Sequence, residues 1–443
     1  MGALITRRKF LSTTSLAVVA PTLLRATQPT SYDTVIIGAG TAGLTAANAL
    51  AQHGLKVLVL EARSRVGGRA WTDSEALGAP ADLGASWLHN RDINPLVGFA
   101  RQQGVTLHDS STENVVFLRD GRPIGAFKTA MGAISGESGY LGASFRGGFW
   151  GEGDDASLKE MLPGSGWGAV LREISAMSMA QDSDKVSFAD YQSMADGDDY
   201  LPQDGVGHLV ARLAQGIDIR LDHEVQEIDW SGPQCRITGD FGTVDAATCL
   251  ITVPTTVLAE GQIAFKPKLP DAKQTAFENL RLGRFMKVIY RIPEIVSDVE
   301  EFHVDFKKME AGKDTVIHVN PYSPTVTAFY SGSNKDAADA LSSAELDAFS
   351  REVIKAKLGS EFAEKLGEFI SYDWDSDPWA GGSYSVVKVG ATTARRDYSQ
   401  PVGETLFFAG EASDNSMATT VGGAFVAAQE QVDAILARLQ KFR

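Results

Sequence analysis

A glycine-rich turn between a strand and a helix constrains this chain more than any other feature. In the stretch "YDTVIIGAGTAGLTAANALAQHGLKVLVLEA", Gly38, Gly40 and Gly43 form the spacing GxGxxG between a β-branched run and a helical pattern. The first glycine permits a tight turn, the second lets a pyrophosphate reach the helix N-terminus, and the third allows close packing of helix on strand. Strand 56–60 then returns beside the first strand through a right-handed crossover. This pattern predicts a βαβ dinucleotide-binding unit.

Glu61 ends the second strand of that unit, where a carboxylate can accept both hydroxyls of a ribose. A carboxylate there disfavours the additional phosphate of NADP but does not separate NAD from FAD. The segment "EARSRVGGRAWT" then adds a second loop suited to phosphate, which a simple NAD domain does not need. Its relevant residues are Arg63, Arg65, Gly67, Gly68 and Arg69.

The composition narrows the class of protein. At 443 residues the chain exceeds the size of one core, so we expect two domains. The net charge of -15 argues against a nucleic-acid partner, because phosphate binding depends on clustered Lys and Arg. The two cysteines, Cys235 and Cys249, each lie in an apparent strand, and the seven histidines have no ligand spacing. We therefore expect no metal site.

The N-terminal segment 1–30 is similar to a twin-arginine export signal. "TRRKFL" precedes the run "STTSLAVVAPTLL", which is too short and too rich in Ser and Thr to span a bilayer. This route carries folded proteins, which suits a protein that takes up a cofactor before export. The segment predicts an exported or periplasmic bacterial protein without a stable membrane span, and leaves open whether the leader is cleaved.

Other segments predict further elements. Ser342 and Glu345 fit a capping box that begins a helix, with Leu346, Phe349, Val353 and Leu358 on one face. A last helix is expected from about Val421. The glycine-rich segment 131–153 is open to two interpretations, a mobile lid or an irregular surface loop.

Four segments carry a family resemblance. "EARSRVGGRAWT", "ADLGASWLHNRDINPL", "CLITVPTTVLAEGQIAFKPKLP" and "GETLFFAGEASDNSMATTVGGA" are similar to segments of the flavin amine oxidases, and within them of the polyamine oxidases and flavin-dependent histone lysine demethylases. The resemblance implies an α/β (α+β) two-domain fold with a discontinuous, Rossmann-like FAD-binding domain. That domain would comprise residues 31–95, 205–268 and 375–443. An inserted substrate-binding domain of mixed sheet and helices would comprise residues 96–204 and 269–374.

The resemblance also assigns residues to FAD. It places Ser86, Trp87 and His89 beside the flavin, the backbone of Val225 at the adenine end, and Glu411 at the ribityl and pyrophosphate part. The last helix would present its N-terminus, with Thr419 or Thr420 as cap followed by Val421, to the flavin pyrimidine ring. Its dipole would stabilise the negative charge of reduced flavin there. Asn90 follows His89 where the family usually has glycine, which leaves the geometry of the entrance open.

Two further segments are assigned to the chemistry. Lys287 lies within an apolar strand and is either an edge or snorkelling residue, or the family's lysine that holds a water against the flavin N5 atom. The turn "DPWAGGSYSV" matches the one along the flavin edge, so its glycines would approach the flavin, Trp379 would contact it and Tyr384 would form one wall of the amine pocket. Ser383 stands where monoamine oxidases have the cysteine that bonds to flavin, so we expect non-covalent FAD. Thr420 replaces the second aromatic wall, which implies a wider pocket.

The resulting hypothesis is FAD-dependent oxidation of a primary or secondary amine, a polyamine among the candidates. Hydride transfer to flavin N5 would give an imine and then an aldehyde, with oxygen returning the flavin and forming hydrogen peroxide. The expected catalytic residues are Lys287, Tyr384, His89 and Thr420. One alternative is an L-amino-acid oxidase, for which Arg146 and Arg284 are candidate carboxylate ligands by residue type alone. Others are an amine dehydrogenase that passes electrons to a periplasmic cytochrome, and a non-catalytic flavoprotein. The sequence does not indicate an oligomeric state.

Overall fold

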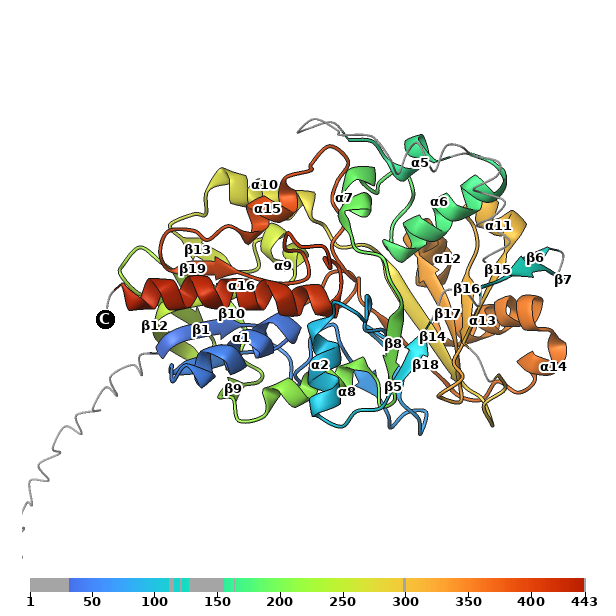
Figure 1. The fold of residues 1–443 in the computed structure, drawn as a ribbon, viewed down its shortest axis with the longest axis horizontal. Helices are drawn as coiled ribbons and strands as arrows, with labels where there is room; N and C mark the ends of the chain where they lie inside the picture. Colours follow the sequence, from blue (N-terminus) through green and yellow to red (C-terminus); the bar gives the residue numbers. More distant parts are fainter. Residues whose placement is uncertain are drawn as a thin grey trace, which may run out of the picture.

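The fold was analysed in a computed structural model, which describes residues 32–110, 115–119, 122–126, 155–162, 164–297 and 300–441. The predicted signal segment 1–30 and the glycine-rich segment 131–153 both lie outside these residues. Figure 1 shows two sheets with their helices arranged side by side, one around β1 and β12 and the other around β14 and β17.

The first sheet has eight strands in the order β13-β10-β11-β12-β1-β2-β9, with β19 also paired to β12. Their bounds are β1 Tyr32–Ile37, β2 Val57–Leu60, β9 Ile219–Arg220, β10 Val225–Asp229, β11 Cys235–Gly239, β12 Gly242–Ile251, β13 Ala264–Lys266 and β19 Leu406–Phe408. Strand β1 pairs in parallel with β2 and with β12. The predicted βαβ unit is therefore confirmed, with helix α1 (Thr41–Gln52) as its crossover.

Close packing of α1 on this sheet depends on Gly43. A Cβ atom at that position would lie 2.0 Å from the carbonyl oxygen of Gly38. The last helix, α16 (Val421–Gln440), lies beside α1 on the same face of the sheet (Figure 1), and Leu50 of α1 and Ile435 of α16 are buried in one core. The two helices therefore bring the first glycine turn and the N-terminus of α16 to the same end of the sheet.

The second sheet has seven strands in the order β18-β14-β17-β16-β15-β6-β7. Their bounds are β6 Val115–Arg119, β7 Arg122–Ala126, β14 Phe285–Arg291, β15 Glu301–Asp305, β16 Val316–Val319, β17 Thr325–Ser331 and β18 Phe369–Asp373. Alternation along β14 places Met286, Val288 and Tyr290 in a core under helix α13 (Ser343–Leu358). Phe285 and Lys287 consequently lie on the opposite face, where Phe285 packs in a cluster with helix α6 (Gly166–Ser178) and Lys287 contacts the segment 82–86.

Helix α13 shows where the sequence prediction was right and where it was wrong. The capping box of Ser342 and Glu345 is present, as predicted. Phe349, predicted to face inward, is 36% exposed. The inward face instead includes Ser350, whose hydroxyl is hydrogen-bonded to Tyr330, and Lys357, which forms an ion pair with Asp314. Partnered polar groups thus occupy positions that an apolar pattern assigns to hydrophobic residues.

The strands of each sheet come from the segments that the predicted domain division gives to it. Two helices outside the predicted FAD-binding segments nevertheless pack in the cores of the first sheet. These are α2 (Pro95–Gln102), through Leu96, and α10 (Asp271–Asn279), through Phe277. Within the described residues, none of the helices has both the length and the apolar character that crossing a bilayer requires.

Candidate functional site

A cavity of about 480 Å³ lies between the two sheets. Its lining includes the predicted cofactor-binding and catalytic residues except Gly43, which packs α1 on the strand, and it also lacks Arg65, whose guanidinium donates to the carbonyls of Val66 (3.2 Å) and Gly68 (2.9 Å). The cavity therefore joins the glycine turn of the first sheet to Lys287 on the second.

At the first-sheet end, two glycine turns pack against each other beneath Glu61. A Cβ atom at Gly68 would lie 3.2 Å from the Cα atom of Gly40. Glu61 is only 4% exposed, and its carboxylate accepts hydrogen bonds from the backbone N–H of Ala39 (2.7 Å) and of Arg63 (2.9 Å). The two oxygens retain further lone pairs towards the cavity, where the hydroxyls of a ribose can donate.

The residues at this end fit a dinucleotide. Gly40 is the N-cap of α1 and has no side chain to occupy the first-turn N–H groups, which leaves them for an anion. Among the residues that the structure describes, the Nε atom of Arg63 is buried without a hydrogen-bond partner. A buried unpaired donor beside a glycine cradle and a carboxylate matches the pyrophosphate and ribose of FAD.

Further along the cavity, Glu411 connects two loops. Its carboxylate accepts hydrogen bonds from Arg69 Nη1 (2.8 Å) and from the N–H (3.1 Å) and hydroxyl (2.7 Å) of Ser385. Burial alone would raise the pKa of Glu411, but the charge of Arg69 and the bonds from Ser385 hold it below its usual value. Glu411 is therefore a fixed anion in the cavity wall.

Arg395 supports that arrangement and was not predicted from the sequence. It forms a bidentate ion pair with Asp190 (2.6 and 2.9 Å) and donates to the hydroxyl of Ser385 (2.8 Å). The contact joins helix α15 (Ala394–Ser399) to helix α7 (Phe188–Ser193). No local pattern indicates a pair that lies 205 positions apart in the chain.

The N-terminus of α16 meets the cavity at Thr419, Thr420, Val421 and Ala424. Of the two predicted caps, Thr420 takes the position: its hydroxyl accepts from the N–H of Gly423 (3.0 Å) and donates to the carbonyl of Met417 (2.7 Å). The positive end of the helix dipole therefore lies at the cavity.

Replacing Thr420 with valine is expected to lower the free energy of unfolding by about 1 kcal/mol, because the N–H of Gly423 loses its acceptor. Urea unfolding of the apoprotein measures this change. Thr420→Ser keeps the hydroxyl and is the matched control. Equal stability of the valine and serine variants would contradict the capping role.

Lys287 is neither an edge nor a snorkelling residue. Its strand, β14, lies between β17 and β18, and the side chain is 6% exposed. The ammonium donates to the carbonyls of Asp82 (3.0 Å) and Gly84 and to the hydroxyl of Ser86 (2.6 Å). Burial lowers the pKa of Lys287 to about 8, against the opposing charge of Asp82. A lysine in this state exchanges a proton near physiological pH.

Trp87 and Tyr384 are both fixed by hydrogen bonds. The indole N–H of Trp87 donates a hydrogen bond to Glu300 (3.1 Å). This buried carboxylate also accepts a hydrogen bond from the hydroxyl of Ser110 and is hydrogen-bonded to His318 Nε2. The hydroxyl of Tyr384 donates to the carbonyl of Ser178 at the end of α6 (2.7 Å), and burial raises its pKa. Sequence reasoning missed Glu300 and His318, because neither lies near Trp87 in the chain.

Asn90, which stands where the family usually has glycine, has a left-handed backbone conformation. Its φ of 57° is in the left-handed region, which asparagine tolerates better than most residues. Its N–H donates to Asp199 (3.0 Å), and the same carboxylate is hydrogen-bonded to His89 Nδ1 (2.8 Å). Asn90 thus has a backbone conformation that glycine adopts without strain, and the turn holds His89 at the cavity wall.

The glycine pair of the turn 379–384 serves a different purpose from the one predicted. A Cβ atom at Gly381 would lie 2.7 Å from Thr256, and one at Gly382 would lie 2.5 Å from Leu282. Neither glycine lines the cavity, whereas Trp379 and Tyr384 do. The prediction that the glycines approach the flavin is wrong, because their close contacts are with neighbouring protein segments.

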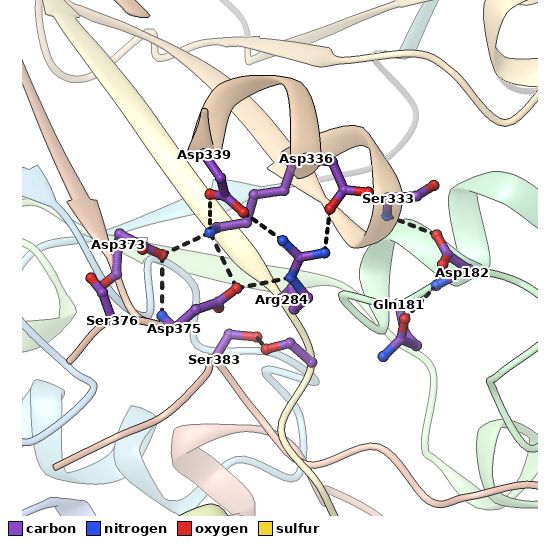
Figure 2. A network of polar contacts seen from close by, with 12 residues as sticks. Gln181, Asp182, Arg284, Ser333, Asp336, Asp339, Asp373, Asp375, Ser376 and Ser383 are labelled. Atoms are coloured by element: carbon purple, nitrogen blue, oxygen red, sulfur yellow. Dashed lines mark hydrogen bonds and ion pairs between the residues drawn. The ribbon is translucent and has the colours of Figure 1, made fainter. Parts of the chain in front are cut away.

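Arg284 does not line the cavity. Figure 2 shows its guanidinium among three carboxylates, with which it forms ion pairs: Asp336, Asp339 and Asp375. The interpretation of Arg284 as a ligand for a substrate carboxylate is therefore wrong. Arg146, the other candidate, lies outside the described residues.

A glycine cradle with a ribose-type glutamate shares one cavity with a buried lysine and two hydrogen-bonded aromatic residues, which defines a dinucleotide-binding protein whose cavity extends beyond the dinucleotide cradle. The match to known families specifies it further. Residues 41–128 and 168–436 match the family described as flavin containing amine oxidoreductase. The chain belongs to this family.

Relatives within the family differ in size and name. The chain is 28% identical to the human lysine-specific histone demethylase 2, over 98% of this chain and 57% of that protein. It is 29% identical to polyamine oxidase 3 of Oryza sativa subsp. japonica, over 88% of this chain and 86% of that protein. The chain thus spans little more than half of the demethylase.

Solved structures show the same fold. Cyclohexylamine oxidase from Brevibacterium oxydans IH-35A has a TM-score of 0.77 at 22% identity, and putrescine oxidase bound to putrescine has 0.75 at 24% identity. In both comparisons the match covers 92% of this chain and 99% of the other. At this identity the likeness concerns the fold.

Proposed function

We propose that the protein oxidises a primary or secondary amine with non-covalently bound FAD and that oxygen is the electron acceptor. The observation that carries the proposal is the single cavity that contains both the dinucleotide cradle at Glu61 and the pocket of Trp87, Lys287 and Tyr384. When bound, FAD would supply the redox chemistry by accepting a hydride from the carbon next to the amine nitrogen.

The chain's own residues would hold the cofactor at several points. Glu61 would accept the ribose hydroxyls, and the N-terminus of α1 would receive the pyrophosphate. Non-covalent binding is supported by Ser383, whose hydroxyl is used in a bond to the carbonyl of Gly283 (2.8 Å). Both cysteines, Cys235 and Cys249, are buried within the first sheet.

The residues around the reacting amine would position it and exclude water from it. Tyr384 and Trp87 exclude water, and their hydrogen bonds to Ser178 and Glu300 hold them in place. Lys287 would hold or release a proton at Nζ, which its lowered pKa of about 8 permits.

Reduction of the bound flavin by amines under anaerobic conditions tests the function. Only a deprotonated amine can release hydride readily, and an alkylamine has a pKa near 10.4, as lysine has. At subsaturating amine the second-order rate constant of bleaching is therefore expected to rise about tenfold per pH unit between pH 6 and 9. A profile that is flat over this range would exclude the mechanism.

The acceptor and the location are also proposals. The segment 1–30 resembles a twin-arginine signal, which would deliver the folded holoenzyme to the periplasm. Replacing Arg7 and Arg8 with lysine is expected to stop export, as fractionation would show. Reoxidation by oxygen that is slow against turnover with an artificial acceptor would favour an amine dehydrogenase instead.

A further inference from the structure

One wall of the cavity, on the side of the second sheet, is apolar. Strands β6, β15 and β16 and helix α6 contribute apolar side chains to it: Val115, Ile174, Met177, Phe302, Val304 and Val316. From this wall we infer that the substrate is a monoamine with an alkyl or aryl body rather than a diamine or polyamine, an inference that rests on the proposed function.

The wall is continuous with a packed core. Val304 and Val316 are each 2% exposed and belong to the hydrophobic cluster that lies between the second sheet and α6. The less buried members of the wall pack against that cluster from the cavity side, as does Trp87. A close-packed core resists rearrangement, so the wall offers a fixed apolar surface to the substrate body.

The carboxylates in and behind the described lining already have other partners or lie elsewhere. Glu61 and Glu411 belong to the proposed cofactor part, and Glu224 precedes Val225 at the expected adenine end. Asp199 lies on β8 (Asp199–Pro202), which does not contribute to the wall, and its two oxygens are hydrogen-bonded to His89 Nδ1 and to the N–H of Asn90. Behind the wall, the carboxylate of Glu300 is hydrogen-bonded to Trp87, Ser110 and His318.

A second amino group would meet this wall at the far end of a diamine. An ammonium pressed against hydrocarbon loses its hydration without gaining a partner, so the group must bind in its neutral form. A hydrocarbon end at the same place gains from removal of its surface from water. A diamine must therefore lose the protons of both amino groups before it binds, whereas a monoamine must lose only one. The wall in this way favours substrates with one amino group.

Hexylamine and 1,6-diaminohexane test this selection because they differ only in the second amino group. Anaerobic stopped-flow bleaching of the holoenzyme would give the second-order rate constant for each between pH 7.5 and 9.5. We expect the logarithm of this constant to rise with pH with a slope of about 1 for hexylamine and about 2 for the diamine, and a preference for hexylamine on the order of 100-fold at pH 8.

Equal slopes, or a diamine that reacts as fast as hexylamine at pH 8, would overturn the inference and leave amine oxidation standing. Absence of bleaching by these and by aromatic and cyclic monoamines would overturn the proposed function together with the inference.

A substitution at Met177 tests the wall itself. Met177→Glu places a carboxylate there, and Met177→Gln is the control of equal size without the charge. At pH 8 the glutamate variant is expected to raise the ratio of diamine to monoamine rate constants at least about tenfold, and the glutamine variant to leave it within about twofold. An unchanged ratio in a folded glutamate variant would contradict the assignment of this wall to the substrate body. If Met177→Glu does not fold, Ile174→Glu on the same helix places a carboxylate in the same wall and tests the same expectation.

Discussion

Replacing Lys287 with methionine is expected to slow turnover of the holoenzyme by about 100-fold or more, the usual contribution of a positioned proton donor or acceptor. Lys287 lines the cavity, and its pKa is lowered by burial to about 8. Methionine has a similar shape but neither donates nor accepts a proton at this position. Single-turnover flavin reduction and reoxidation by oxygen, measured separately, would show which half-reaction uses the lysine.

The chain provides a matched control in Lys273. This residue is also buried and donates three hydrogen bonds to backbone carbonyls, those of Asp397, Tyr398 and Gln400, but it does not line the cavity. Lys273→Met is therefore expected to lower stability by a similar amount while the rates of both half-reactions stay within about twofold. If the two variants lose stability alike and neither loses activity, Lys287 is structural and its proposed role is refuted.

The lowered pKa of Lys287 also makes the stability of the protein depend on pH. The pKa of Lys287 is about 8 in the folded protein and 10.5 as its ordinary value, so the unfolded chain binds more protons between these values. Stability from this group therefore rises as the pH increases from about 8 to 10.5. Urea unfolding at several pH values should show a smaller rise in Lys287→Met than in the parent protein, and an unchanged rise would contradict the lowered pKa.

Features that depend on neighbours in the sequence could be predicted. The glycine turn and Glu61 lie within one βαβ unit, and Thr420 caps the helix that begins at the next residue. The capping box of Ser342 and Glu345 is similarly local. In each case the partners are a few residues apart or in a fixed supersecondary unit, so the spacing itself determines the contact.

Contacts between distant segments could not be predicted in the same way. Ser86, an acceptor for Lys287, lies 201 positions from it, and Asp190 lies 205 positions from Arg395. The resemblance gave Lys287 a place beside the flavin, but its three hydrogen bonds follow from the arrangement of the two sheets. The same holds for Glu300 and Trp87, which lie 213 positions apart.

The apolar wall was missed for another physical reason. Strand β16 contributes Val316 to the wall, but all four of its residues are buried and the adjacent Val316 and Ile317 are both apolar, so polarity does not distinguish the face towards α13 from the face towards the cavity. Val316 lines the cavity, whereas Ile317 belongs to the core under α13. Burial on both faces therefore removes the signal that would separate a core residue from a substrate contact.

Replacing Glu61 with glutamine is expected to weaken FAD binding by about 10- to 100-fold. Hydrogen bonds to a charged acceptor contribute about 1.5–3 kcal/mol, and glutamine removes both the charge and one acceptor oxygen. Its NH₂ group would face the N–H of either Ala39 or Arg63, each of which donates to Glu61 in the parent protein. Titration of the apoprotein with FAD, followed by quenching of flavin fluorescence, measures the change.

Asp314→Asn is the control for buried carboxylates in general. Asp314 forms an ion pair with Lys357 outside the lining of the cavity, so its loss should lower stability and leave FAD affinity unaltered. Binding to the native state stabilises it by RT ln(1 + [L]/Kd), so the gain in melting temperature on adding FAD should shrink for Glu61→Gln and persist for Asp314→Asn. An equal gain in both variants would show that Glu61 supports the turn without holding the ribose, and the dinucleotide would then be bound mainly through the glycine cradle and the N-terminus of α1.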